Sequence, residues 1–465
     1  MLTVPSDLHS RLRQYGQDHV LTGWERLTDD ERTNLLGQLA ALDLAELSNL
    51  YAQREKSFPL PAADRITPAP IVPRGAPDET AARRQGEDAL RRGEVAVLVV
   101  AGGQGSRLGF EQPKGMFPIG PVTNKTLFQI HAEKVLALRH RYQSPMLYLV
   151  MTSPATDAET RRYFADNAHF GLSAEDVWFF VQGTMPALDL ATGRLLLEKP
   201  GKLFLGPDGH GGTLTALADT GLLDKLRTRG VRQLFYFQVD NPLVKIADPV
   251  FLGHHLTRRG EASSKVVPKL GPTDKLGNIV QVDGRCTIIE YSDLPPELAH
   301  AKDDNGRLRL WSGSPAIHIF DLEFLARVTK GADRIPFHLA RKKVPHVDDA
   351  GRPVQPTTEN ALKFERFIFD VLPLAARWTV VESSRAEEFA PLKNAEGADS
   401  SAAVQQAISD LTASWLETAG ITVPRRADGT AAVLLEVAPQ FALDAEEFAA
   451  RVDRGTKIDG PRYFE

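Results

Sequence analysis

The sequence predicts a doubly wound α/β protein in which strands of a central sheet alternate with helices. Apolar runs of strand length recur at residues 95–100, 146–151, 177–181 and 234–239. A run that is apolar at every position is typical of a strand buried on both faces, as in a parallel sheet. Helical candidates lie between the runs at 125–139, 157–167 and 212–229. This alternation predicts right-handed crossovers, with ligands bound beyond the carboxyl ends of the strands.

The composition excludes several classes of protein. Hydrophobic residues make up 42% and charged residues 25% of the 465 residues, which excludes a disordered or collagen-like chain. The net charge of −5 disfavours a nucleic-acid partner, and the single cysteine, Cys286, excludes an internal disulfide and a thiolate metal site. The sequence has no apolar stretch of membrane-spanning length and no signal-peptide core. We therefore expect a cytoplasmic protein with no membrane partner.

We expect residues 1–90 to form an N-terminal helical region with a structural role. Thr28 and Glu31 match a capping box, and leucines follow at helical spacing from Leu35 to Leu50. Residues 58–77 contain six prolines and little periodicity, which predicts a connector.

The second and third regions follow without a repeat. Residues 91–382 carry the α/β pattern, and Asp283-Gly284 predicts a hairpin after an alternating stretch at 278–282. Residues 383–465 predict a small α+β domain with a strand at 432–437 and a helix at 445–452. Its first helix carries apolar residues on one face, at Val404, Ile408, Leu411 and Trp415.

The strongest local motif is the glycine-rich loop at 101–109 with Pro113-Lys114-Gly115 after it. A dinucleotide fingerprint fails because Leu108 stands where the third glycine should be, and no Gly-Lys-Ser/Thr follows as in a P-loop. Backbone amides at such a turn can cradle an anion. Arg107 and Lys114 add two cations, which suits a triphosphate whose charge develops during transfer.

Two weaker motifs also follow apolar or glycine-rich stretches. The loop Pro207–Thr213 offers amides at the start of a helix, although a flexible loop explains it equally well. Asp240 ends an apolar strand, where a carboxylate can hold Mg²⁺ together with substrate phosphates. Alone, such an aspartate is more often a cap or a turn former. Phe367 and Phe369 could equally be core residues, and Lys393 an ordinary solvated lysine.

Together these segments resemble the eukaryotic-type UTP–sugar-1-phosphate uridylyltransferases, and within them the UDP-N-acetylhexosamine pyrophosphorylases. The resemblance extends from about Asp29 to Lys393 and rests on motifs in the same order, at 102–109, 113–115, 125–129, 207–212, 239–241, 245–249, 290–292 and 391–394. It implies a glycosyltransferase-A-like central mixed sheet flanked by a helical N-terminal region and a small C-terminal domain. It also implies that a sugar 1-phosphate attacks the α-phosphorus of UTP and expels pyrophosphate.

The resemblance implies a role for each matching position. Gly102, Gly103, Gln182 and Gly209 would hold the uridine, and Asp240 would bind Mg²⁺ or Mn²⁺. Arg107, Lys114 and Lys393 would stabilise the phosphates and the transition state. The sugar would contact His210, Gly277, Glu290, Tyr291, Ser314, Phe367 and Phe369, with the aromatic residues forming an apolar wall for the acetamido methyl group. UTP and a sugar 1-phosphate would be the partners, and the oligomeric state stays open.

Two positions depart from the family pattern and keep alternatives open. His210 and Ser314 stand where the family usually has asparagine, both near expected sugar hydroxyls. A UTP–glucose-1-phosphate uridylyltransferase or a broad-specificity UDP-sugar pyrophosphorylase is therefore an alternative. A non-catalytic nucleotide-sugar binder is disfavoured because Arg107, Lys114 and Asp240 are all present. A dehydrogenase is disfavoured because the required glycine and ribose-binding carboxylate are missing.

Overall fold

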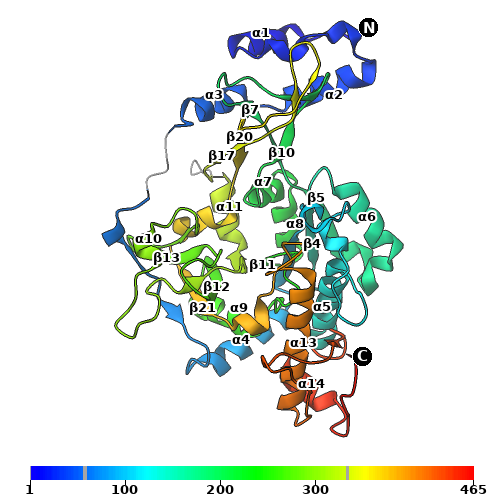
Figure 1. The fold of residues 1–465 in the computed structure, drawn as a ribbon, viewed down its shortest axis with the longest axis vertical. Helices are drawn as coiled ribbons and strands as arrows, with labels where there is room; N and C mark the ends of the chain where they lie inside the picture. The colour runs from blue at the N-terminus through cyan, green and yellow to red at the C-terminus, as the bar shows by residue number, and fades with distance from the viewer. Residues whose placement is uncertain (1, 56–59, 331–334) are drawn as a thin grey trace. The chain divides into compact units, whose positions relative to one another are not determined.

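The computed structural model describes residues 2–55, 60–330 and 335–465, and its contacts divide the chain into two compact units (Figure 1). The smaller unit comprises Met1–Leu60, Gln182–Thr213 and Ile335–Asp370. The larger unit comprises Pro61–Val181, Leu214–Arg334 and Val371–Glu465. Two segments from the middle of the chain thus join the N-terminal residues. The division into residues 1–90, 91–382 and 383–465 stays a prediction.

The larger unit is built on a mixed sheet, as the sequence predicts. Four strands are parallel and lie in the order β11–β3–β4–β5 (Gln233–Gln238, Val95–Val100, Tyr148–Thr152 and Val177–Val181). β16 (His318–Asp321) pairs antiparallel with both β11 and β12 (Ala262–Pro268). The remaining strands are β1 (Ile66–Pro68), β2 (Ile71–Val72), β13 (Asn278–Val282), β14 (Arg285–Ile289), β15 (Ser312–Gly313) and β21 (Trp378–Glu382).

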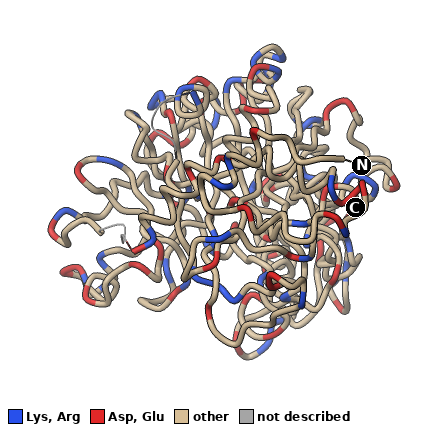
Figure 2. Tube along the Cα trace, turned by 90° about the horizontal axis from the view of Figure 1, so that it is seen from above, with Lys and Arg blue, Asp and Glu red and all other residues tan. Residues whose placement is uncertain are grey.

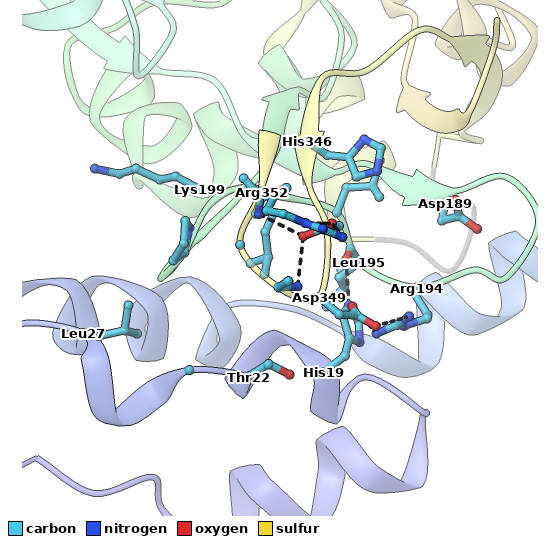
Figure 3. A pocket seen from close by; sticks show the side chains of 18 of the residues that line it. His19, Thr22, Leu27, Asp189, Arg194, Leu195, Lys199, His346, Asp349 and Arg352 are labelled. Atoms are coloured by element: carbon cyan, nitrogen blue, oxygen red, sulfur yellow. Dashed lines mark hydrogen bonds and ion pairs between the residues drawn. The ribbon is translucent and has the colours of Figure 1, made fainter. Parts of the chain in front are cut away.

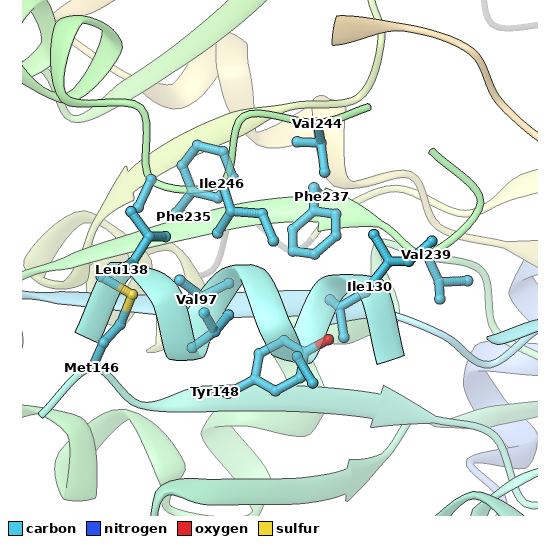
Figure 4. Packing of buried hydrophobic residues seen from close by; sticks show 14 of the residues in the cluster. Val97, Ile130, Leu138, Met146, Tyr148, Phe235, Phe237, Val239, Val244 and Ile246 are labelled. Carbon is cyan, nitrogen blue, oxygen red and sulfur yellow. The ribbon is translucent and has the colours of Figure 1, made fainter. Parts of the chain in front are cut away.

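Helices are interleaved with these strands. They are α4 (Glu79–Arg91), α5 (Leu127–Tyr142), α6 (Asp157–Asp166), α7 (Gly212–Asp219), α8 (Leu222–Thr228), α9 (Pro249–Thr257), α10 (Pro296–Ala299), α11 (Leu322–Lys330) and α12 (Arg385–Glu388). Of these, α4, α5, α6 and α9 pack on the sheet through apolar side chains. Ile130 and Leu138 of α5 pack over Val97, Tyr148 and Phe237 of the strands (Figure 4). Burial of this apolar surface is the main force that holds α5 on the sheet.

The smaller unit combines three N-terminal helices with short antiparallel strands. The helices are α1 (Ser6–Gln14), α2 (Asp29–Ala40) and α3 (Leu44–Ala52). The strands are β6 (Thr184–Pro186), β7 (Leu188–Asp189), β8 (Leu197–Lys199), β9 (Lys202–Leu203), β10 (Leu205–Pro207), β17 (His338–Lys342), β18 (His346–Val347), β19 (Pro353–Val354) and β20 (Ala361–Glu365). Leu12, Leu35 and Leu39 share one core with Leu188 and Phe364, so the helices do not form a core alone.

The C-terminal residues have a hydrophobic cluster of their own within the larger unit. α13 (Ser401–Thr418) and α14 (Ala445–Arg451) pack with β22 (Leu435–Val437) and β23 (Arg462–Phe464). The cluster includes Leu416, Leu435, Phe448 and Phe464, all of them buried.

Several local predictions are confirmed. Thr28 and Glu31 form the capping box of α2, and Asp283-Gly284 turns between β13 and β14 with both residues at positive φ. Cys286 is buried in β14 as a free thiol, and burial raises its pKa to about 12. A small core residue was the expectation for this position.

Other local predictions are wrong or fall outside the described residues. The helix predicted at 212–229 is two helices, because the chain turns at Gly221, whose φ is +67°. The connector predicted at 58–77 contains β1 and β2, while its residues 58 and 59 lie outside the described residues. By contrast, the predicted helix with Val404, Ile408, Leu411 and Trp415 on one face is present as α13. Val404 is buried and the other three are partly buried, with Ile408 and Trp415 packed against hydrophobic clusters.

Charged residues of both signs are spread over the chain. Figure 2 shows Lys and Arg interspersed with Asp and Glu along the chain, without a long run of one sign. Among the residues that the structure describes, no helix has both the length and the apolarity that crossing a membrane requires.

Candidate functional site

The predicted site residues fall into two groups, one in each unit. Those of the larger unit are Gly102, Gly103, Arg107, Lys114, Asp240, Gly277, Glu290, Tyr291, Ser314 and Lys393. Those of the smaller unit are Gln182, Gly209, His210, Phe367 and Phe369. Each group has its own geometry.

In the larger unit, two motifs leave the sheet side by side. β3 and β11 are parallel neighbours whose last residues, Val100 and Gln238, are directly paired. The glycine-rich loop follows β3 and Asp240 follows β11, so both begin at the same edge of the sheet. We call Arg107, Lys114, Asp240 and Leu392 the phosphate edge. Ligands of open α/β sheets bind at such an edge, beyond the carboxyl ends of the strands.

The glycine-rich loop folds back on itself and carries Lys114 to this edge. The Lys114 N–H donates to the Gly103 carbonyl at 3.0 Å. A Cβ on Gly115 would lie 2.3 Å from the Phe128 ring, so only glycine lets this turn seat on α5. A Cβ on Gly103 would meet no atom within 4 Å, which leaves its backbone open to a ligand. Arg107 is exposed and makes no ion pair with any other described residue.

Lys114 connects the loop with Asp240. Its Nζ lies 3.5 Å from Asp240 Oδ2 and donates to the Leu392 carbonyl at 3.3 Å. The Leu392 N–H in turn donates to the Asp240 carbonyl at 2.8 Å. Lys393 therefore directly follows a residue that contacts both Lys114 and Asp240. The structure thus brings Lys114 and Asp240 together although they are far apart in the sequence, and the main chain of Lys393 begins one residue after their shared partner Leu392.

The donor set around Asp240 fits a hard cation better than a soft one. In the described part of the chain no group of three or more His, Cys, Asp or Glu side chains could hold a metal ion. Structural zinc sites need such a set, whereas Mg²⁺ is usually held by one or two carboxylates together with substrate phosphates and water. Asp240, whose side chain is 12% exposed, offers one carboxylate of this kind.

A second part of the larger-unit group gathers around the β13–β15 pair. The Ser314 N–H donates to the Gly277 carbonyl at 2.9 Å, and the Ser314 hydroxyl accepts from the Ala316 N–H at 3.3 Å. A Cβ on Gly277 would lie 3.2 Å from Glu290 Oε1, so Glu290 borders the same position. Tyr291 is 46% exposed, unusually high for a large aromatic side chain. Gly277, Glu290 and Ser314 are thus brought together.

In the smaller unit, the loop 207–212 pairs closely with the chain after β20. The Arg366 N–H donates to the Asp208 carbonyl at 2.7 Å, and the Gly211 N–H donates to the Arg366 carbonyl at 2.8 Å. Gly209 has a φ of +85°, and a Cβ there would lie 2.4 Å from the Arg366 carbonyl oxygen. Both facts require glycine at this position. The loop is therefore a fixed turn, which decides against the flexible alternative.

Asp208 is a site feature that the motif contained but the sequence analysis did not single out. It is 5% exposed, its carboxylate accepts from the Gln182 side chain, and its Oδ1 has no hydrogen-bond partner among the described residues. Burial raises its pKa to about 6, against the opposing charge of Arg366 and the Gln182 hydrogen bond. Gln182 and the loop that carries Gly209 are thus joined through this carboxyl group.

His210 lies among aromatic rings, which we call the aromatic cluster: His210, His338, Phe367 and Phe369. Phe367 and Phe369 stack at 5.1 Å between centroids, and the His210 ring lies 5.4 Å from Phe367. His210 Nδ1 accepts from the Ile368 N–H at 3.2 Å. Burial lowers the pKa of His210 to about 4, and the charge of His338 acts in the same direction. The ring is therefore neutral near pH 7, with its proton on Nε2.

His338 was not among the candidates from the sequence, because it has no neighbours at the spacing of zinc ligands. Its Nε2 lies 2.8 Å from Asp370 Oδ2, and its ring lies 4.5 Å from Phe367. Since Asp370 directly follows Phe369, the pair holds one side of the aromatic cluster. Asp370 directly follows the predicted residues Phe367 and Phe369 in the sequence, which is the one signal that could have pointed to this pair.

A large cavity elsewhere in the smaller unit contains none of the predicted residues (Figure 3). It measures about 840 Å³ and lies between the N-terminal helices and the segments 189–200 and 346–352. Two of its cations are already neutralised, because Arg194 pairs with Asp349 at 2.8 Å and Arg352 pairs with Asp348 at 2.7 Å. Its other charges are mixed in sign, so the cavity does not resemble a phosphate site.

Comparison with known proteins gives one consistent result. The family model described as UTP–glucose-1-phosphate uridylyltransferase matches residues 59–450. The chain is 38% identical to the UDP-N-acetylhexosamine pyrophosphorylase-like protein 1 of Xenopus tropicalis, covering 84% of this chain and 80% of that protein. It is 35% identical to the UDP-N-acetylglucosamine pyrophosphorylase of Saccharomyces cerevisiae, covering 93% and 94%.

A solved structure agrees with these relatives. The crystal structure of the uridine diphosphate N-acetylglucosamine pyrophosphorylase from Trypanosoma brucei, determined in complex with an inhibitor, superimposes with a TM-score of 0.81. The two sequences are 28% identical, and the match covers 97% of this chain and 95% of that one.

Proposed function

Because the chain belongs to the UTP–glucose-1-phosphate uridylyltransferase family, we propose that it transfers a uridylyl group from UTP to an N-acetylhexosamine 1-phosphate. The products are UDP-N-acetylglucosamine (or UDP-N-acetylgalactosamine) and pyrophosphate. The names of the relatives from Xenopus tropicalis, Saccharomyces cerevisiae and Trypanosoma brucei support the acetamido sugar. A cytoplasmic location and the absence of a nucleic-acid partner stay predictions.

The observation that carries this proposal is the contact between Lys114 and Asp240 at the phosphate edge, 3.5 Å apart. A cation on the loop after β3 and a carboxylate after the neighbouring parallel strand β11 suit a triphosphate and the divalent ion that accompanies it. Arg107 and Lys393 add two cations, and neither is engaged in an ion pair with another described side chain. We assign Gly102, Gly103, Gln182 and Gly209 to the uridine by their match to the family motifs.

The reaction needs positioning and charge neutralisation rather than a general base. An oxygen of the sugar 1-phosphate attacks the α-phosphorus of UTP, and the bond from that phosphorus to the bridging oxygen of the β-phosphate breaks. The electron pair leaves with pyrophosphate, and no proton has to be removed from the attacking dianion. Arg107, Lys114 and Lys393 stabilise the negative charge that builds up on the phosphoryl oxygens. Their charges are worth more in the transition state than in the bound substrates.

Asp240 would hold Mg²⁺ or Mn²⁺ on one side of the triphosphate. When bound, the ion neutralises phosphate charge and orients the α-phosphate. Lys114 lies close enough to Asp240 to keep its carboxylate in place before UTP arrives.

His210 and Ser314 favour keeping a second candidate activity in view. Where the family usually has asparagine, the neutral His210 ring uses Nδ1 to accept from the Ile368 N–H. The Ser314 hydroxyl accepts from Ala316 and has a shorter reach than an asparagine amide. A UTP–glucose-1-phosphate or broad-specificity activity would follow if these residues relax the sugar pocket.

The experiment that tests the proposal measures pyrophosphate release from UTP. The purified chain is assayed with Mg²⁺ and N-acetylglucosamine, N-acetylgalactosamine and glucose 1-phosphates. We expect the highest kcat/KM with an acetamido sugar. A higher value with glucose 1-phosphate would establish the second candidate, and no release with any of the three would revive a non-catalytic nucleotide-sugar binder.

A further inference from the structure

The segment 388–392, which precedes Lys393, is tied to the residue after Asp240. The Asn241 side chain is 3% exposed and uses both ends of its amide on this segment. Its Nδ2 donates to the Glu388 carbonyl at 2.7 Å, and its Oδ1 accepts from the Ala390 N–H at 3.1 Å. Two residues further on, the Leu392 N–H donates to the Asp240 carbonyl at 2.8 Å. Asp240 and Asn241 thus hold the segment at three alternate residues, 388, 390 and 392.

The loop that carries Asp240 and Asn241 is itself fixed from α5. His131 Nε2 hydrogen-bonds to the Val239 carbonyl at 2.9 Å. Lys134 Nζ donates to the Pro242 and Val244 carbonyls at 2.5 and 2.9 Å. Since α5 packs on the sheet, this loop is a firm base for the segment 388–392. Burial lowers the pKa of Lys134 to about 7, which fits its place in the interior.

The segment is also anchored at its beginning, by the side chain of Glu388. Asn241 then fixes the path of the main chain that follows. The side chain of Glu388 accepts from the fully buried Lys265 at 2.6 and 2.7 Å. Lys265 holds the carboxylate, whereas Asn241 holds the main chain at residues 388 and 390. An amide is the side chain that offers a donor and an acceptor at a fixed separation. Losing it leaves the buried Glu388 carbonyl and the partly buried Ala390 N–H unsatisfied.

We propose that Asn241 is a positioning residue that sets where Lys393 lies relative to Asp240 and Lys114. It acts through the main chain of residues 388–392 and need not touch the substrates. The inference rests on the proposed function, because it gives Lys393 a role at the phosphates. A displacement of about 1 Å in such a group can cost about 10²-fold in rate.

A double-mutant cycle with Lys393 tests this role. We expect Asn241→Ala to lower kcat about 10-fold or more in the wild-type background. In a Lys393→Ala background the same change should lower kcat less than about twofold, because residues that act as a unit are not additive. Full additivity of the two substitutions, or a kcat within about twofold of wild type for N241A, would overturn the proposal.

Asn360 offers a matched control, because its side-chain amide also donates and accepts hydrogen bonds with the main chain. Its Oδ1 accepts from the Val344 N–H at 2.8 Å and its Nδ2 donates to the Val344 carbonyl at 3.0 Å, and Val344 is not a proposed site residue. Asn360→Ala should lower the Tm but leave kcat unchanged in both backgrounds. If N241A does not fold, Asn241→Ser, which keeps a hydroxyl at this position, takes its place in the cycle with the same two outcomes.

A measurement that needs no activity separates failure of this proposal from failure of the proposed function. Hydrogen exchange of the amides at Ala390 and Leu392 should be at least about 10-fold faster in N241A than in wild type, since their local protection is lost. N360A should leave it unchanged. Unaltered exchange in N241A overturns the positioning role. A further outcome is faster exchange in N241A together with a wild-type chain that releases no pyrophosphate with any sugar. That result supports the anchoring of residues 388–392 by Asn241 and contradicts the proposed function.

Discussion

The phosphate edge and the aromatic cluster solve different problems with different chemistry. The phosphate edge brings the cation Lys114 within 3.5 Å of the carboxylate Asp240, and main-chain hydrogen bonds hold both in place. The aromatic cluster consists of rings 4.5–5.8 Å apart around a histidine that is neutral at pH 7. The phosphate edge therefore acts through charge, and the aromatic cluster through the shape of a packed apolar surface.

This difference teaches where each kind of substitution should act. Charges that face a developing phosphoryl charge act chiefly on the transition state, so their loss lowers kcat. Rings and neutral hydrogen-bonding groups recognise a substrate in its ground state, so changing them alters KM and the choice between substrates. The expected effects therefore become smaller from the phosphate edge to the aromatic cluster.

The largest effect should come from removing the divalent ion. Excess EDTA should abolish pyrophosphate release, because without the ion the Asp240 carboxylate would repel the triphosphate and the three cations alone would not neutralise its charge. Adding back Mg²⁺ should restore it. In Asp240→Asn the Mg²⁺ concentration for half-maximal activity should rise, as measured by titration with UTP saturating. Full activity in excess EDTA would contradict the metal-binding role of Asp240, and with it the view that the phosphate edge acts through charge.

The next largest effect belongs to Lys114. We expect Lys114→Ala to lower kcat by about 10²-fold or more, as for other charges aimed at a transition state. The fold should persist, since the side chain is 20% exposed and its contacts among the described residues are the Leu392 carbonyl and the Asp240 carboxylate. Lys199→Ala, in the exposed rim of the smaller-unit cavity, is a control that should retain wild-type turnover. Near-wild-type turnover of K114A would mean that the phosphate edge does not neutralise charge.

Much of the phosphate edge could be predicted from the sequence, because its signals are local. The apolar run at 95–100 and the glycines after it predict a buried strand and an open loop, and both are present. That Asp240 lies beside this loop follows from β3 and β11 being neighbours, which periodicity alone does not show. Asn241 could not be found this way, because its partner Glu388 is 147 residues further along the chain.

The aromatic cluster was harder to predict, since its parts come from three separate segments. Phe367 and Phe369 alternate as core residues do, and only the pairing of residues 208–211 with Arg366 places His210 among them. The joining of 182–213 and 335–370 to the N-terminal helices is equally long-range. Local patterns predict strands and turns, but they do not predict which distant segments share a core.

Asp208 gives an intermediate effect that appears in stability rather than rate. Its folded-state pKa of about 6 lies above the ordinary 3.8, so the folded protein binds this proton more tightly than the unfolded chain. Stability should therefore fall as pH rises from about 4 to about 6, and the full cost applies above that. Asp208→Asn should be more stable at pH 8 by up to about 3 kcal/mol, at about 1.4 kcal/mol for each pKa unit.

Urea denaturation at pH 8 and at pH 4.5 measures this difference. The advantage of D208N should shrink toward the lower pH, because both proteins are then neutral at this position. Equal stability of the two proteins at pH 8 would mean that the carboxylate is compensated by Arg366 and Gln182. If Asp208 also serves the loop that carries Gly209, D208N should raise the KM for UTP while it stabilises the fold, as functional sites often trade stability for binding.

The smallest effect should separate sugars rather than abolish catalysis. Restoring asparagine in His210→Asn with Ser314→Asn should raise the kcat/KM ratio of N-acetylglucosamine 1-phosphate to glucose 1-phosphate by about 10-fold, a typical value for gaining a hydrogen bond in a pocket. An asparagine side chain offers a donor and an acceptor, whereas the Nδ1 of His210 already accepts a hydrogen bond from the Ile368 N–H. His346→Asn, in the cavity of the smaller unit, is the matched control and should leave the ratio unchanged. An unchanged ratio in the double variant would show that the sugar is chosen elsewhere, and attention would turn to Tyr291 and Glu290. A ratio that rises without loss of kcat would confirm that shape recognition and charge neutralisation are separate in this protein.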